Sequence, residues 1–342
     1  MDIIYIGEIP PPYGGITVKN ELLLRKIFGG YEVDYIDVKE SQITLFIKLV
    51  MRFIKCRFCK KPIFIGIGGK RRLHKLLLLI YIFGGTKVLK CTSVIDMAST
   101  LSEYCKKNHS IIYLLERCAK VYIELSTMME DMSRYKLVNC SLLPNCRDGL
   151  LARKPHEINM PVRLLFFSRI NRAKVVPIIF ETAKVLDDNG IKYSIDFWGE
   201  IDDIEYEDEF LENIKQHPKC KYCGIFDVVK DDLYKKMNEY DIFLLPTTWL
   251  GESCCGAIVE SKMAGIPAIV NDWHYNKEMV LPGEGYVLDI LSEKSYAECI
   301  MRLISDEDLY RSMAQEAYAS RIRYDYDTYR SQIENDIQHL PI

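Results

Sequence analysis

Short apolar runs and amphipathic stretches alternate along this chain. The runs have the character of buried β-strands, and the stretches between them repeat their apolar positions with helical spacing. The first half predicts strands over 2–7, 31–38, 62–67 and 87–92, and a helix over 17–28. The second half predicts strands over 163–168, 193–199, 219–226, 241–247 and 267–272, and helices over 175–188, 207–216, 231–240 and 252–264. This alternation predicts an α/β protein with two parallel sheets in tandem.

A polar stretch bracketed by Pro155 and Pro161 is typical of a linker between two domains. We expect an N-terminal Rossmann-like domain over 1–155 and a C-terminal Rossmann-like domain over 156–320. A C-terminal helix over 321–342 could return to the N-terminal domain. The stretch 110–126 fits a helix or a strand, and we divide it near Cys118.

Composition places the chain among ordinary globular proteins. Of its 342 residues 49% are hydrophobic and 27% charged, and the net charge is −3. This balance argues against a dedicated nucleic-acid binder. The twelve cysteines come without the basic start of a signal peptide, so we expect reduced, mostly buried thiols in the cytoplasm. The Cys56/Cys59 and Cys220/Cys223 pairs lie far apart in the sequence, and we expect no metal site.

Charge is distributed unevenly. Residues 41–95 contain twelve Lys and Arg but no Asp or Glu, whereas the rest of the chain has 33 Lys and Arg against 48 Asp and Glu. Three interpretations stay open: a helix in the interface of an anionic membrane, a buried helix with a solvated basic face, and a nucleic-acid surface. We favour the membrane, hence a peripheral protein on the inner face of the cytoplasmic membrane. The residues expected to face it are Lys48, Arg52, Lys55, Arg57, Lys60 and Lys61.

Two segments have the residue types that bind phosphate. Gly14 and Gly15 lie between the first strand and the first helix, where glycine lets a ligand approach the backbone N–H groups of a helix start. Arg169 and Lys174 follow the strand at 163–168, and ligands of open α/β sheets bind beyond the carboxyl ends of strands. Such cations suit a diphosphate, although either segment alone also fits an ordinary loop.

A third segment pairs two glutamates. Glu252 and Glu260 are eight positions apart, a little over two helical turns, so in one helix their carboxylates would face the same side. The small residues between them leave room for a ligand near the backbone N–H groups of Cys254, Cys255 and Gly256. Glu252 also fits a helix cap, an explanation that does not extend to Glu260.

These motifs resemble glycosyltransferase family 4, whose members are retaining enzymes of the GT-B fold. Glu252 and Glu260 match the family's Glu-x7-Glu motif, and Arg169 and Lys174 match its diphosphate-binding pair. The proline–glycine segment 10–15 is similar to its N-terminal glycine loop. The resemblance covers about residues 140–290 and 7–20. It implies two Rossmann-like domains that face each other across a cleft.

The resemblance also implies residue roles. Gly14 and Gly15 would lie at the donor phosphates, and Arg169 and Lys174 would hold the diphosphate as negative charge develops on it. Glu252 would contact the transferred sugar, and Glu260 the ribose. The amides of Cys254, Cys255 and Gly256 would lie near the sugar and the phosphates.

The implied activity is metal-independent, cofactor-free transfer of a sugar from a nucleotide-diphosphate donor with retention at the anomeric carbon. The implied partners are a nucleotide sugar and a saccharide or lipid-linked saccharide acceptor of surface-polysaccharide synthesis; no nucleic acid is expected. The sequence departs from the family at three places: Val175 replaces a glycine, Cys146 follows Asn145 where a glycine is usual, and residues 90–99 contain no histidine. The missing histidine and Val175 favour an alternative, a catalytically inactive GT-B binding protein. A Rossmann dehydrogenase is disfavoured because no Gly-x-Gly-x-x-Gly follows the first strand.

Overall fold

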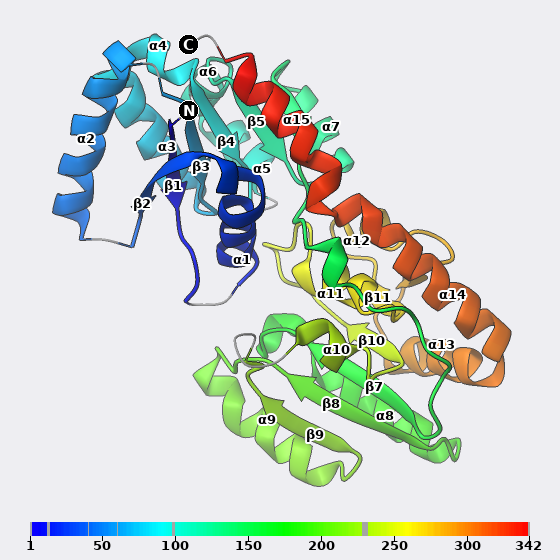
Figure 1. Cartoon of the computed structure of the whole chain (residues 1–342). Helices are drawn as coiled ribbons and strands as arrows, with labels where there is room; N and C mark the ends of the chain where they lie inside the picture. Colours follow the sequence, from blue (N-terminus) through cyan, green and yellow to red (C-terminus); the bar gives the residue numbers. More distant parts are fainter. Residues whose placement is uncertain are drawn as a thin grey trace. The chain divides into compact units, whose positions relative to one another are not determined.

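The computed structural model describes residues 2–11, 14–39, 41–59, 61–97, 100–227 and 232–340. Two six-stranded parallel sheets organise this part of the chain, which confirms the predicted α/β class (Figure 1). The first sheet has the order β2 (Glu32–Asp37), β1 (Asp2–Gly7), β3 (Ile63–Gly66), β4 (Thr92–Ile95), β5 (Lys120–Ile123) and β6 (Cys140–Leu142). The second has the order β12 (Gly285–Leu288), β11 (Ala268–Asn271), β10 (Ile242–Leu245), β7 (Val162–Phe167), β8 (Tyr193–Trp198) and β9 (Cys220–Gly224).

The chain divides into two compact units that do not follow one cut in the sequence. Unit 1 comprises Met1–Asp148, Gly251–Cys254 and Tyr324–Ile342, and unit 2 comprises Gly149–Leu250 and Cys255–Arg323. The first division thus falls at Asp148, a little before the proline-bracketed stretch where we expected the linker. The C-terminal residues belong to unit 1.

Helices flank the strands of both units. Those of unit 1 are α1 (Gly15–Leu22), α2 (Gln42–Cys59), α3 (Lys70–Leu79), α4 (Gly85–Leu89), α5 (Leu101–Lys107), α6 (His109–Leu115), α7 (Ser126–Ser133) and α15 (Tyr326–Gln338). Those of unit 2 are α8 (Pro177–Asp188), α9 (Ile204–Gln216), α10 (Leu233–Met237), α11 (Gly256–Met263), α12 (Asn276–Met279), α13 (Glu293–Ser305) and α14 (Glu307–Ser320). Short π-helical turns, η1 (Leu23–Ile27) and η3 (Ile80–Gly84), continue α1 and α3.

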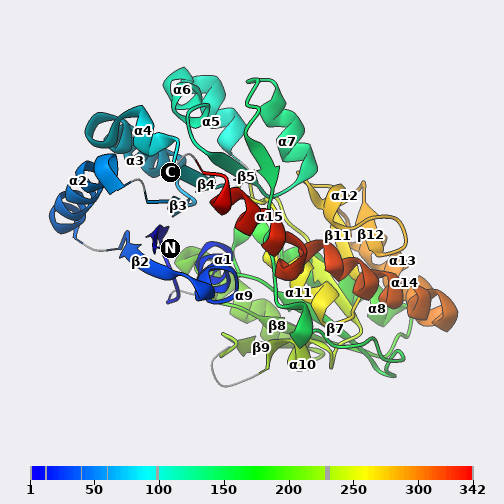
Figure 2. The ribbon, with the colours of Figure 1, turned by 45° about the horizontal axis from the view of Figure 1, so that its top comes forward.

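The core of unit 1 includes residues from distant parts of the sequence. Apolar side chains of β1, η1 and β3 pack there against α15, which contributes Tyr326, Tyr329, Ile333 and Ile337. The Tyr122 hydroxyl of β5 donates a hydrogen bond of 2.8 Å to Asp336 of the same helix. Figure 2 shows α15 beside the strands of unit 1. This helix therefore completes a core that the first 148 residues begin.

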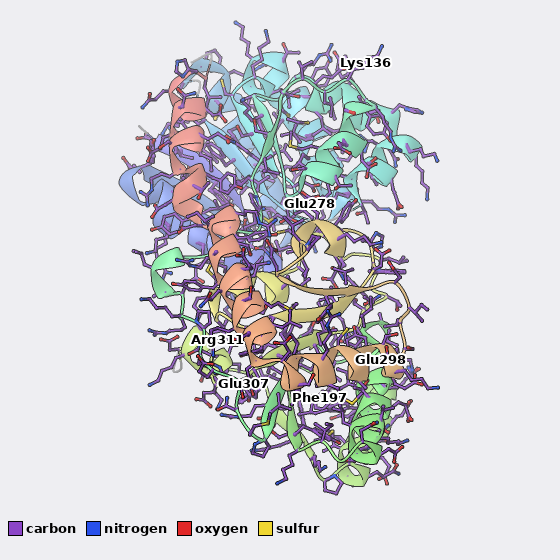
Figure 3. The ribbon with its side chains drawn as sticks, turned by 90° about the vertical axis from the view of Figure 1, so that its right-hand side faces the viewer. Lys136, Phe197, Glu278, Glu298, Glu307 and Arg311 are labelled. Atoms are coloured by element: carbon purple, nitrogen blue, oxygen red, sulfur yellow. The ribbon has the colours of Figure 1, made fainter. Side chains whose placement is uncertain are left out.

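Unit 2 has an aromatic core. Phe197 of β8 (Figure 3) stacks with Phe180 of α8 at 5.2 Å between ring centroids and meets Phe210 of α9 edge-on at 5.7 Å. The segment before β7 is held by an ion pair. Arg311 of α14, labelled in Figure 3, binds both carboxylate oxygens of Glu157 at 3.0 Å. The helices α8 and α9 are therefore fixed to β8 by stacked and edge-on aromatic rings.

Several predicted elements need correction. The strand predicted over 87–92 is wrong: α4 runs to Leu89 and β4 begins only at Thr92, because Lys87 and Lys90 are exposed whereas all four residues of β4 are buried. The predicted helix 17–28 ends as regular α-helix at Leu22 and continues as η1. The edge strands β6 and β12 were missed, since both are short and mostly half-buried.

Each sheet reverses its winding at one point. In unit 1 the order reverses between β1 and β3, and in unit 2 between β10 and β7. Open α/β sheets bind ligands outside the carboxyl ends of the strands at such a point. The loops after β7 and β10 are therefore the first place to look for a site in unit 2.

Candidate functional site

The loop after β7 presents Arg169 at the reversal point of the unit 2 sheet. Its Nη1 donates a hydrogen bond of 2.9 Å to Asp202, in the loop after β8, and its guanidinium lies 5.3 Å from the ring centroid of Trp249, in the loop after β10. The side chain stays 52% exposed. Asp202 thus uses one of the five N–H donors and orients a guanidinium whose side chain stays about half exposed.

The loops after β7 and β8 approach closely at Gly199. A Cβ on this glycine would lie 1.8 Å from the carbonyl oxygen of Ser168, which no side chain allows, and its φ of +151° favours glycine as well. Asn171 adds a second link, because its Nδ2 donates a hydrogen bond of 2.8 Å to Asp202. Asp202 thereby holds both Arg169 and the turn that follows it.

That turn, a 3-10 helix over Arg172–Lys174, brings Lys174 to the same edge of the sheet. Lys174 is only 4% exposed. The carbonyl of Ala173 accepts hydrogen bonds from the backbone N–H of Thr248 at 2.7 Å and from its hydroxyl at 3.2 Å. The turn is therefore tied to the loop after β10, and the two predicted cations both lie in the loop after β7, beside the reversal point.

Val175, next in the chain, has φ +46° and ψ +36°, the left-handed conformation. A β-branched residue adopts this conformation at a cost, whereas glycine adopts it freely. The position where the family resemblance led us to expect glycine is thus one where the backbone needs it. The backbone geometry is kept in spite of the substitution.

The helix predicted over 252–264 begins later than expected. α11 starts at Gly256 with Cys255 as its N-cap, so the predicted start of the helix is wrong. Glu252 lies in the loop before the helix, and only Glu260 projects from it. Glu252, 8% exposed, and Cys254 belong to unit 1, whereas the half-buried Glu260 projects from α11 in unit 2. Residues 251–254 belong to unit 1, where Cys254 is hydrogen-bonded to Asn145 and Glu124, and they are not part of the helix.

Two of the three amides predicted to face a ligand have partners within the chain. The Cys254 N–H donates to Glu124 at 3.5 Å, and the Cys255 N–H points to the Met279 sulfur at 3.1 Å. Burial raises the pKa of the Cys254 thiol well above its usual range.

The far end of α11 is anchored by charge. Lys262 is 2% exposed and its ammonium lies 2.7 Å from Glu284, which also binds Arg323 through both carboxylate oxygens, at 2.8 and 2.6 Å. Burial lowers the pKa of Lys262 to about 8. This network fixes the orientation of the helix that presents Glu260.

In unit 1 the predicted glycine loop opens α1. Gly14 is the N-cap, and its backbone N–H donates a hydrogen bond of 3.0 Å to the hydroxyl of Thr17. Gly15 is exposed. One turn into the helix, the buried Lys19 forms an ion pair of 2.9 Å with Glu124, which follows β5. A second buried pair joins Lys70 to Asp96 after β4. Pro12, Tyr13, Ala98 and Ser99 lie outside the described residues.

The basic region of 41–95 forms a surface rather than a core. Lys48, Lys55 and Arg57 of α2 are exposed, Arg52 is half-buried against Asp34 at 2.9 Å, and Lys61 pairs with Asp2. Lys60 lies outside the described residues. The same helix exposes large apolar side chains: Ile43, Phe46, Ile47, Met51, Ile54 and Phe58. The interpretation as a buried helix with a solvated basic face does not account for these apolar residues.

The described residues contain no group of three or more His, Cys, Asp or Glu side chains able to hold a metal ion. None of the described helices has the length and apolar composition needed to cross a bilayer. Sequence reasoning missed Asp202 and Trp249 as partners of Arg169. Neither belongs to a motif, and only the sheet order brings the loops after β8 and β10 to the loop after β7.

Comparison with known proteins points to one family. Residues 151–320 match the model of the family described as glycosyl transferases group 1. The amylovoran biosynthesis glycosyltransferase AmsD of Erwinia amylovora is 25% identical over 179 residues, which are 52% of this chain and 46% of that relative. The match therefore spans less than half the length of this curated relative.

Solved structures share the whole fold at low identity. HepE of Anabaena, solved in complex with UDP, has a TM-score of 0.75 and 16% identity, over 99% of this chain and 100% of that one. Sucrose-phosphate synthase of Thermosynechococcus elongatus has a TM-score of 0.72 and 13% identity, over 99% of both chains. These likenesses and the two parallel sheets establish the GT-B fold that the sequence analysis expected.

Proposed function

The chain belongs to the glycosyl transferases group 1 family, and from this premise we propose that it transfers a sugar from a nucleotide-diphosphate donor to a saccharide acceptor. The observation that carries the proposal is that Arg169 and Lys174 both lie in the loop after β7, at the reversal point of the unit 2 sheet. Two cations at this place suit a diphosphate, and HepE of the same fold binds UDP.

The chemistry follows from where charge develops. As the bond between the anomeric carbon and the diphosphate oxygen breaks, negative charge accumulates on the leaving nucleoside diphosphate. Arg169, already oriented by Asp202 and Trp249, and the largely buried Lys174 stabilise that charge without having to reorganise. Preorganised cations of this kind can take the place of a metal ion, which is why we propose a metal-independent and cofactor-free reaction.

We further propose that the reaction retains the anomeric configuration. In such a reaction the acceptor hydroxyl attacks the face that the diphosphate leaves, and the departing phosphate oxygen takes its proton. No protein base is then required. Glu260, on the anchored helix α11, is proposed to bind the ribose hydroxyls. The roles of Gly14, Gly15 and Glu252 stay predictions.

Substitutions of the two site residues test this proposal. We expect Lys174→Ala to lower the rate of transfer or donor hydrolysis by about 100-fold or more, the usual effect of removing one group that stabilises a developing anion. We expect Glu260→Ala to weaken donor binding. Lys184→Ala is the matched control, because Lys184 is an exposed lysine of the same unit. Unchanged turnover in both site variants would remove the site assignment.

A thermal-shift screen with UDP, GDP, ADP and their sugars identifies the donor, since a bound ligand stabilises the folded protein by mass action. Binding of a donor without turnover on any acceptor would favour the alternative, an inactive GT-B binding protein.

The surface of α2 supports a proposal about location. We infer that unit 1 adheres to an anionic membrane surface on its cytoplasmic side and that the acceptor is a lipid-linked saccharide of surface-polysaccharide synthesis. Exposed Ile43, Met51 and Phe58 next to basic residues are the composition of a helix that lies in a membrane interface. Co-sedimentation with vesicles tests the inference: equally low recovery on neutral and anionic vesicles would contradict it.

A further inference from the structure

Two tryptophans lie at the carboxyl edge of the unit 2 sheet, beside the proposed diphosphate site. Trp249 is in the loop after β10, and Trp273 is in the loop after the neighbouring strand β11. The indole N–H of Trp273 donates a hydrogen bond of 2.8 Å to the backbone carbonyl oxygen of Trp249. The two loops are therefore joined at these residues, to which the proposed transfer reaction assigns no contact with substrate.

The loop that presents Trp249 is fixed where it leaves the sheet. The buried Thr247 exchanges two hydrogen bonds with Asn271 of β11: its N–H donates to the side-chain oxygen of Asn271 at 2.8 Å, and the side-chain N–H of Asn271 donates to its carbonyl oxygen at 2.9 Å. The Thr247 hydroxyl accepts a further hydrogen bond of 3.2 Å from the N–H of Trp249. The backbone of Trp249 is thus ordered without a ligand, which lowers the entropy lost when one binds.

The loop after β11 has a strained backbone. His274 has a φ of +47°, in the left-handed region that a residue with a side chain adopts at a cost. Its imidazole meets the indole of Trp273 edge-on, with 4.9 Å between the ring centroids. Strained residues persist where the surrounding structure imposes them, and they cluster at ligand sites. This loop is therefore a second indication that the edge around the tryptophans has a function beyond stability.

The indole of Trp249 lies next to the cation proposed to bind the diphosphate. The guanidinium of Arg169 is 5.3 Å from its ring centroid, and 38% of Trp249 remains exposed. Tryptophan is highly buried on average, and it is enriched among the residues that dominate binding surfaces. The two side chains thus offer a ligand a charged contact and an aromatic contact side by side.

A nucleotide sugar has the matching arrangement. The transferred sugar and the ribose are the two groups bonded directly to the diphosphate, whereas the base lies beyond the ribose. Because Glu260 is proposed to bind the ribose, the group left to lie beside Arg169 and Trp249 is the sugar. A pyranose has an apolar face of C–H groups, whose slightly positive hydrogens are attracted to the negative face of an indole.

We propose that Trp249 determines sugar specificity by stacking its indole on the pyranose ring of the transferred sugar, and that Trp273 is a positioning residue that holds the loop of Trp249. The proposal rests on the glycosyl transfer proposed above and deepens it by naming the side chain that recognises the sugar. Arg169 and Trp249 then bind adjoining parts of one donor, the diphosphate and the sugar.

Orientation of Arg169 is the competing explanation for Trp249, and it predicts a different pattern of affinity. A nucleoside diphosphate and its nucleotide sugar both contain the diphosphate, so loss of an orienting residue weakens the binding of the two equally. Loss of a stacking residue weakens the nucleotide sugar far more than the nucleoside diphosphate. The comparison of the two ligands therefore separates a contact with the sugar from a role in the structure.

The test is calorimetric titration of the full-length chain with matched pairs: UDP with UDP-glucose and UDP-galactose, GDP with GDP-mannose, and ADP with ADP-glucose. We expect Trp249→Leu to weaken the bound nucleotide sugar by about 10-fold and its nucleoside diphosphate by less than about 3-fold. Trp249→Phe keeps an aromatic face, so it should lose less than about 3-fold for either. Ile290→Ala is the matched control, because it removes another exposed apolar side chain of unit 2.

Trp273→Phe tests the positioning role. It keeps an aromatic ring but removes the N–H that binds the Trp249 carbonyl oxygen. We expect the nucleotide sugar to bind about 3-fold more weakly and the nucleoside diphosphate to bind almost as in the wild type. Wild-type affinity for the nucleotide sugar in this variant would contradict the positioning role.

Fluorescence reports on the ring itself and needs no leucine variant. In a Trp198→Phe chain the two remaining tryptophans are Trp249 and Trp273. We expect the nucleotide sugar to protect their emission from quenching by acrylamide more than its nucleoside diphosphate does, because the stacked sugar shields the indole from solvent. Adding Trp249→Phe should abolish this difference, since the shielded indole is then gone.

The outcomes keep this proposal apart from the proposed function. If the wild type binds none of the pairs, the donor site fails, and the sugar contact fails with it. If the wild type binds a pair but Trp249→Leu weakens both members equally or neither, stacking on the sugar is overturned and the donor site stands. Full protection from acrylamide by the nucleoside diphosphate alone would overturn the stacking as well, since the base would then cover the indole.

Discussion

At the scale of single residues, Val175 has a backbone conformation that glycine adopts more readily, and glycine is the residue that the family resemblance led us to expect there. The backbone keeps a left-handed conformation between the turn of Lys174 and the start of α8, although valine is β-branched. The departure therefore affects stability first, and it gives no independent support to loss of activity. The sequence alone could name the departure but not its consequence, because φ at this position is set by the two loops that meet there.

Replacing this valine should relieve the strain. We expect Val175→Gly to raise the free energy of unfolding by about 1 kcal/mol, the relief of a left-handed β-branched residue less the entropy that glycine gains in the unfolded chain. Urea denaturation followed by tryptophan fluorescence measures it in unit 2. Val185→Gly within α8 is the control, and it should lower stability, since helix interiors disfavour glycine. A loss of stability in Val175→Gly would contradict the strained conformation.

A second residue-scale prediction concerns Cys220. Burial, with Asp187 and Asp196 nearby, raises the pKa of its thiol to about 12. In the unfolded chain the thiol ionises near pH 9, so between pH 9 and 12 the folded state holds a proton that the unfolded state has lost. This contribution to stability is complete below pH 9 and falls as pH rises.

We therefore expect the free energy of unfolding to drop more between pH 8 and 10.5 in the wild type than in Cys220→Ala, by about 2 kcal/mol. Denaturation curves followed by tryptophan fluorescence at several pH values measure the difference. Parallel pH profiles for the two proteins would show that the buried thiol is not responsible.

At the scale of elements, prediction from sequence succeeded where burial alone decides the structure. The central strands β1, β3, β10 and β11 are almost entirely buried, and their continuous apolar runs marked them in the sequence. It failed where long-range contacts decide. The start of α11 was placed too early because residues 251–254 are held by Asn145 and Glu124, more than a hundred positions away. The cations of the candidate site were found, but their partners on other loops were not.

Helix α2 gives a prediction at the same scale. Because Ile47 and Phe58 are 53% and 86% exposed, we expect Ile47→Ser with Phe58→Ser to leave the melting temperature unchanged but to weaken vesicle binding. Phe53, on the same helix, is fully buried, and Phe53→Ser should lower the melting temperature instead. Calorimetry and vesicle co-sedimentation measure the two effects. Unaltered vesicle binding in the double variant would contradict a membrane role for the exposed apolar side chains of α2.

At the scale of the whole molecule, two units share one interleaved chain. Unit 1 takes up residues 251–254 and 324–342 in addition to the first 148 residues. The family match over 151–320 therefore falls mostly on unit 2, and this is also the part of the chain whose helices and strands were easiest to predict. A return of 321–342 to the N-terminal domain was expected, whereas the inclusion of residues 251–254 in unit 1 was not, since it depends on contacts with residues distant in sequence.

This interleaving leads to a prediction about unfolding. Ile333 of α15 is 1% exposed in the core of unit 1, and we expect Ile333→Ala to destabilise that unit by about 3 kcal/mol. Circular dichroism should then show an earlier transition, while the fluorescence of the tryptophans, which all lie in unit 2, reports a transition near that of the wild type. Ser331→Ala, at an exposed position of the same helix, is the control. An unshifted circular-dichroism transition would show that α15 is dispensable for the unit 1 core.

The place of α15 in unit 1 also bears on how the protein is made. During translation, the strands and helices encoded first emerge from the ribosome without the tyrosines and isoleucines that close their core. Unit 1 must wait, with apolar surface uncovered, until unit 2 has been synthesised and residues 326–337 have left the exit tunnel. The nascent chain is thus expected to depend on chaperones during this interval, and the half of the protein that begins synthesis first should be the half that finishes folding last.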